Sequence, residues 1–151
     1  MMEIPVTDTA VDIFVIRAAA EEGIRLTPYD DATGLRVKAP KGHLTWGIGF
    51  DLDVIGSAGL FTAMLRYLVG QIHDDLVEHE WYRLSDPVRQ SVFLDVAYNA
   101  GVSGLLKFPH MIAAASVGDW KTAAAECHVT DPRLDESRYA PLRKLLEEGE
   151  S

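Results

Sequence analysis

A change of residue pattern at Gly23 constrains the fold more than any other feature of this chain. Before Gly23 the apolar residues recur at helical spacing, whereas residues 26–50 are rich in turn signals such as Thr33-Gly34. Between these turns Leu35 and Val37 alternate with basic residues, a period typical of strands. We therefore expect a small antiparallel sheet between helical segments.

Helical patterns cover most of the remaining chain. Asp8 stands at the N-cap position of a first helix that stops at Gly23, and a long apolar stripe after Gly56 predicts a second helix. The dipeptide Asp86-Pro87 begins a third helix, which should be largely buried and should stop at Gly101. Shorter helices are predicted over residues 109–117, 119–125 and 137–148.

The composition indicates one compact domain over residues 1–151. At 151 residues and 48% hydrophobic content, the chain is long and apolar enough to bury a core. Cys127 is its only cysteine, so no internal disulfide forms, and folding in a reducing compartment follows. The plain alternative for Cys127 is a small core residue. The fold class expected is α+β and mainly helical.

The charge pattern excludes some kinds of partner. A net charge of -9 argues against nucleic acid, which is bound through basic phosphate contacts. The five histidines show no metal-ligand spacing, so we expect no metal and no cofactor. The N-terminal segment has no basic region followed by an apolar run, and no signal peptide or membrane span is readable.

Two carboxylates flank the change of pattern, and they fall in different environments. Glu22 lies in the last helical turn before Gly23, where the helix dipole and burial would raise its pKa. Asp31 lies on a turn and should stay ionised. A protonated and an ionised carboxyl group are what the hydrolysis of a glycosidic bond requires. The alternatives are a solvated Glu22 and an Asp31 that only caps the Thr33-Gly34 turn.

A longer motif surrounds these carboxylates. The residues Glu22-Gly23-x-Arg25-Leu26-x-x-Tyr29-x-Asp31, then Gly34 and Thr45-x-Gly47-x-Gly49, resemble the signature of phage-type lysozymes. The segment Gln90–Gly101 resembles the central buried helix of that family, and Gly118-Asp119-Trp120 begins a match to a later short helix. The resemblance implies a lysozyme-like fold, in which a long helix joins a small sheet lobe to a helical lobe and the cleft lies between the lobes.

The resemblance also implies an activity. Enzymes of this family cut the β-1,4 bond between N-acetylmuramic acid and N-acetylglucosamine in bacterial peptidoglycan. Carried over, Glu22 is the general acid, Asp31 holds or deprotonates the attacking water and Thr45 helps to orient that water. The expected outcome is inversion, for which the two carboxyl groups lie roughly 6.5 to 9.5 Å apart.

The same resemblance suggests substrate-binding residues. Tyr29 and Trp46 are candidates for stacking on sugar rings, with burial in the sheet as the alternative. Asn99 is expected to line the cleft, unless it only makes an internal hydrogen bond. The family places an arginine against the catalytic glutamate, and either Arg138 or Arg143 is a candidate for it.

The chain departs from the family pattern at two places. More residues separate Asp31 from Thr45 than in the family, which predicts a longer hairpin beside the cleft and weakens the match at Thr45. After Gly49, the residues Phe50-Asp51-Leu52 are similar to pesticin-like muramidase toxins, which suggests a delivered effector.

These implications define the cellular setting and the competing functions. We expect a monomer, made in the bacterial host cytoplasm, that reaches peptidoglycan through a pore, a virion or a secretion system and binds no membrane. One alternative is a lytic transglycosylase, in which a muramic acid hydroxyl replaces water; Asp31 favours hydrolysis. The other is a domain that binds wall glycan or builds a virion without catalysis.

Overall fold

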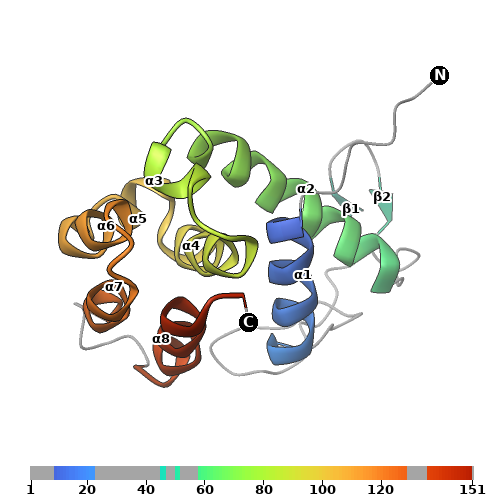
Figure 1. Cartoon of the computed structure of the whole chain (residues 1–151). Coiled ribbons are helices and arrows are strands. Elements are labelled where there is room, and N and C mark those ends of the chain that lie inside the picture. The colour runs from blue at the N-terminus through green and yellow to red at the C-terminus, as the bar shows by residue number, and fades with distance from the viewer. Residues whose placement is uncertain (1–8, 23–44, 47–49, 52–57, 129–135, 151) are drawn as a thin grey trace.

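The computed structural model describes residues 9–22, 45–46, 50–51, 58–128 and 136–150, and this part of the chain is mainly helical, as predicted (Figure 1). Its elements are α1 (Thr9–Glu22), β1 (Thr45–Trp46), β2 (Phe50–Asp51), α2 (Ala58–Leu76), α3 (Glu80–Arg83), α4 (Pro87–Ala100), α5 (Val102–Leu105), α6 (Pro109–Ser116), α7 (Trp120–Glu126), a 3-10 turn (Glu136–Arg138) and α8 (Tyr139–Glu148). None of the described helices has the length and apolar character that a membrane span requires.

Helix α4 forms the centre of the helical assembly. Its first turn is stabilised as the sequence predicts, because the Asp86 carboxylate accepts a hydrogen bond from the Arg89 backbone N–H at 3.1 Å and Pro87 needs no donor there. Gly101 ends the helix with a φ of 77°, a conformation that favours glycine. The seven residues from Ser91 to Ala97 are all buried, which confirms the predicted burial of this helix. In Figure 1, α1 and α2 lie on one side of α4, and α6, α7 and α8 lie on the other.

The helices α1 and α2 cover one side of α4. The residues Val11, Phe14 and Val15 are buried in α1, as their helical spacing predicts, whereas the expected cap Asp8 lies outside the described residues. In α2 the buried positions are Val69 and Leu76, with Leu65 and Ile72 packed partly against the core. The apolar stripe predicted after Gly56 runs through Phe61, Leu65, Leu68, Ile72 and Leu76, and at Leu68 the prediction is wrong: Leu68 is 47% exposed, whereas the neighbouring Val69 is fully buried.

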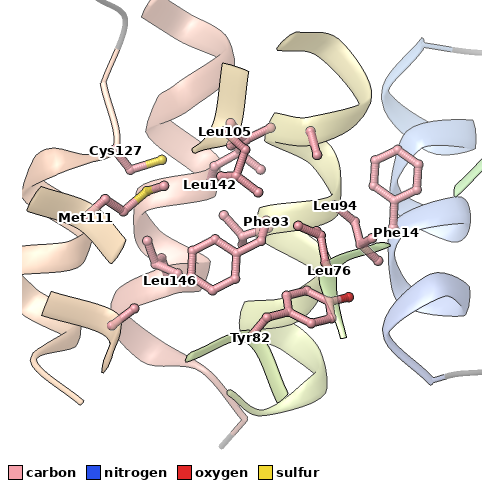
Figure 2. Packing of buried hydrophobic residues seen from close by; sticks show 14 of the residues in the cluster. Phe14, Leu76, Tyr82, Phe93, Leu94, Leu105, Met111, Cys127, Leu142 and Leu146 are labelled. Atoms are coloured by element: carbon pink, nitrogen blue, oxygen red, sulfur yellow. The ribbon is translucent and has the colours of Figure 1, made fainter. Parts of the chain in front are cut away.

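Phe93 of α4 lies near the centre of the core. Its ring meets Trp81 of α3 edge-on, with 5.0 Å between the ring centroids, and Tyr82 lies 6.4 Å away. In the view of Figure 2, Met111 and Leu146 lie on one side of Phe93, and Leu76 and Tyr82 lie on the other. Helices α3 and α5 are not predicted from the sequence, because each is only four residues long.

The C-terminal helices close the other side of α4. α6 and α7 are confirmed, and the Asp119 carboxylate caps α7 by accepting from the Thr122 backbone N–H at 3.1 Å. Hydrogen bonds from Thr122 lower the pKa of Asp119. The predicted helix over 137–148 is also confirmed as α8, apart from the 3-10 turn at its start.

Arg89 fastens the end of α8 to the start of α4. Its Nε donates to the Leu146 carbonyl at 2.8 Å and its Nη2 donates to the Glu147 carbonyl at 2.9 Å. The Nη1 atom donates to the Asp86 carboxylate at 2.7 Å, while the guanidinium lies 4.3 Å from the centre of the Trp120 ring. A cation at this end also opposes the negative pole of the α8 dipole. Arg89 thereby fixes α8, and with it the turn that carries Arg138.

The described part of the sheet consists of two short strands. β1 and β2 pair antiparallel, with Thr45 opposite Asp51 and Trp46 opposite Phe50. The expected strand around Leu35 and Val37 lies outside the described residues.

Cys127 follows α7 and is fully buried, which fits the core role considered for it. Burial raises the pKa of its thiol from 9.0 to about 12, because the thiolate loses its hydration in the core. The pKa is higher in the folded state than in the unfolded state. The thiol therefore stabilises the fold below about pH 9, and this contribution is lost as the pH rises towards 12.

We predict that the free energy of unfolding falls more steeply with pH in the parent protein than in Cys127→Ala between pH 9 and 10.5. The extra slope approaches about 1.4 kcal/mol per pH unit, the value for one proton. Urea unfolding at several pH values measures it, and the other titrating groups are shared by both proteins. Parallel pH profiles would contradict the burial of the thiol.

Candidate functional site

Asp95 provides a buried carboxylate in the middle of α4. The residue is 2% exposed and lies among apolar neighbours on its own helix. A buried carboxylate is costly unless charged donors face it. In this protein the donors are Arg17, Asn99 and Arg138, which come from three parts of the chain. We call Asp95 and these three residues the Asp95 cluster.

Arg17 of α1 binds one side of this carboxylate. Its Nη2 lies 3.2 Å from Asp95 Oδ2 and also donates to the Ser91 carbonyl at 3.0 Å. Its Nη1 donates to the Ser91 hydroxyl at 2.9 Å, and that hydroxyl donates to the Val88 carbonyl at 2.6 Å. The guanidinium is thus bound to α4 at three atoms, which fixes α1 against it.

Asn99 and Arg138 meet at the other carboxylate oxygen. The Asn99 side-chain nitrogen donates to Asp95 Oδ1 at 3.1 Å and to the Asp95 backbone carbonyl at 2.8 Å. Arg138 Nη2 approaches the same Oδ1 at 3.4 Å. Two residues predicted to bind substrate, far apart in the chain, therefore lie together on one buried carboxylate. Asn99 makes the internal hydrogen bonds considered as its alternative role and is also exposed.

The structure distinguishes between the two arginine candidates. Arg143 donates to the Cys127 carbonyl at 3.2 Å and pairs with Glu136, away from Asp95. Arg138 is the one that reaches the Asp95 cluster. Arg138 therefore belongs to the Asp95 cluster, whereas the contact of either arginine with Glu22 stays a prediction, because the Glu22 side chain lies outside the described residues.

The predicted acid Glu22 ends α1, and its side chain lies outside the described part. It follows Arg17 by five residues, a rise of about 7.5 Å along a helix. The backbone of Glu22 therefore lies within two helical turns of the Asp95 cluster. Thr45 and Trp46 form β1, but their side chains are not described, and Tyr29 and Asp31 lie outside the described residues.

Sequence reasoning missed Asp95 and Arg17 as site residues. A signal for both was present, because each is a lone charge in an apolar stretch of a predicted helix: Val92-Phe93-Leu94-Asp95-Val96-Ala97 and Val15-Ile16-Arg17-Ala18. Charged residues at such positions are rarely buried unless they are paired. Each position therefore indicates a paired charge, but the sequence does not identify the residue that pairs with it.

The described residues contain no group of three or more histidine, cysteine or carboxylate side chains able to hold a metal ion. The polar groups brought together by the Asp95 cluster are instead two guanidinium groups, a carboxylate and an amide. These groups bind ligands through hydrogen bonds and charge.

In comparisons with known proteins, neither a family model nor a curated protein nor a solved structure matches this chain. The residue pattern and the geometry of the site are therefore the basis for a functional assignment.

We predict that Asp95→Ala lowers the free energy of unfolding by about 3 to 5 kcal/mol. The substitution leaves Arg17 partly buried without its counter-ion, and breaking a buried ion pair from one side has a cost of this size. The matched control is Asp12→Ala, which removes the partner of Arg66 in a pair whose side chains are 30% and 42% exposed. The control should lose less than about 1 kcal/mol. Urea unfolding measures the loss in the free energy of unfolding for both variants. Equal losses would contradict a larger contribution to stability from the Asp95 cluster than from a more exposed ion pair.

Proposed function

We propose that this chain is a peptidoglycan hydrolase, a muramidase that cleaves the β-1,4 bond between N-acetylmuramic acid and N-acetylglucosamine. The observation that carries the proposal is the convergence at Asp95. Asn99 and Arg138, named from the motif as substrate-binding residues, meet there. They are tied through Arg17 to the helix that ends at Glu22, the proposed acid.

The proposed mechanism divides the work between two carboxyl groups. Glu22 protonates the leaving oxygen, and Asp31 holds or deprotonates the attacking water on the opposite face of the sugar. Thr45 orients this water, and the product has inverted configuration. Inversion needs room for the water between the two carboxyl groups, which sets their separation at roughly 6.5 to 9.5 Å. The chain then folds as one lysozyme-like domain, with α2 joining a small sheet lobe to the helical lobe.

Substrate binding is assigned to both lobes. Tyr29 and Trp46 stack on sugar rings from the sheet side. Asn99 and Arg138 contribute an amide and a guanidinium from the helical side, which fits a glycan rich in acetamido and hydroxyl groups. The enzyme acts as a monomer on the wall of a bacterium after release through a pore, a virion or a secretion system.

We predict that Glu22→Gln abolishes the release of muropeptides, whereas Glu21→Gln keeps most of the parent activity. Glutamine cannot donate the proton, and general acid catalysis contributes about 10²- to 10⁴-fold to the rate. Glu21 is the matched control because it is the same residue type at the preceding position of α1, and successive helix positions are about 100° apart around the axis. Mass spectrometry of soluble products from purified peptidoglycan gives the measurement.

A second pair of variants tests the proposed base in the same assay. Asp31→Asn should be severely impaired and Asp30→Asn much less so. Reducing-end products from the parent support the muramidase. Anhydro products would make the enzyme a transglycosylase, and the absence of products from the parent would contradict any lytic activity. An unimpaired Asp31→Asn variant would show that another group activates the water.

A further inference from the structure

The orientation of the Asn99 amide follows from what faces it. Its side chain approaches two atoms of residue 95, the carboxylate oxygen Oδ1 at 3.1 Å and the backbone carbonyl oxygen at 2.8 Å. A carbonyl oxygen only accepts hydrogen bonds. The carboxylate oxygens face guanidinium groups, which only donate, so they too accept. Asn99 must therefore present its NH₂ group to Asp95.

The opposite end of the amide is then the carbonyl oxygen. The amide nitrogen makes both contacts to residue 95, so Oδ1 of Asn99 is the end of the amide turned away from Asp95, and the residue is exposed. An asparagine free to rotate offers either a donor or an acceptor to a ligand. Here the two contacts with Asp95 fix the choice, and the group that faces away from Asp95 is an acceptor.

We propose that Asp95 is a positioning residue that turns the Asn99 amide oxygen outward, and that this oxygen accepts a hydrogen bond from an acetamido N–H of the bound glycan. The inference rests on the proposed function and adds a specificity to its site. An acetamido group carries a donor N–H, which matches a fixed acceptor. A sugar hydroxyl both donates and accepts and does not need a fixed acceptor.

The test compares two ligands that differ in this donor. One is the β-1,4-linked tetramer of N-acetylglucosamine, and the other is its analogue with acetate esters in place of the acetamido groups. Both are uncharged and similar in shape, but the esters lack the N–H. Binding is measured by calorimetry on Glu22→Gln, which prevents turnover. We expect the acetamido tetramer to bind roughly five- to tenfold tighter, the range for one net hydrogen bond.

Variants identify the residue that recognises the N–H. Adding Asn99→Ala should remove this preference, and adding Asp95→Asn should reduce it while the circular dichroism spectrum stays that of the parent. Gln71→Ala is the matched control, since Gln71 is an exposed amide on α2 bonded to Tyr67, and it should keep the full preference.

The outcomes separate this inference from the function on which it rests. Equal binding of the two tetramers, or a preference that survives Asn99→Ala, would overturn the role of Asn99. A preference unchanged in Asp95→Asn would overturn the positioning role of Asp95. If neither tetramer bound to Glu22→Gln, glycan binding itself, and with it the proposed function, would be contradicted.

Discussion

The buried carboxylate of Asp95 is the interaction on which the arrangement of this protein depends. It lies in the central helix, and its charge is compensated only when α1 brings Arg17 and the turn before α8 brings Arg138. The ion pairs therefore select the packing of both ends of the chain against α4, while Arg89 fastens the far end of α8 to the start of the same helix. The apolar core around Phe93 supplies most of the driving force for folding. Burial of apolar surface has no direction, however, whereas the ion pairs have specific geometry and so select one packing.

Local chemistry made much of the helical fold predictable. The Asp86-Pro87 start and the Gly101 stop define α4 to the residue, because a cap, a proline and a positive φ act within one turn. The exposure of Leu68 was not predictable from its own pattern, since Leu68 and Val69 both fit a broad apolar stripe. Tertiary packing decides between them, and it buries Val69. The short helices α3 and α5 also depend on tertiary contacts, because four residues have little helical stability of their own.

The site was also predictable only in part, because tertiary contacts decide which of its residues meet. The family resemblance named Asn99 and Arg138 as candidates but gave no reason for them to meet, because the partner that joins them, Asp95, was read as part of an apolar helix. Long-range pairing depends on the crossing of α1, α4 and the C-terminal segment, which periodicity does not contain. The opposite case is Arg143, which had the same standing as Arg138 in the sequence and which the fold directs to Cys127 and Glu136.

We propose that the Asp95 cluster and the end of α1 form one glycan-binding site. An NMR titration of isotope-labelled Glu22→Gln with the N-acetylglucosamine tetramer tests it most directly, because each amide and guanidinium signal reports on its own surroundings. The account predicts that the largest shifts occur at the end of α1, at the Asn99 side-chain amide and at Arg138. Shifts confined to α6 and α7, or no shifts at saturating ligand, would contradict it.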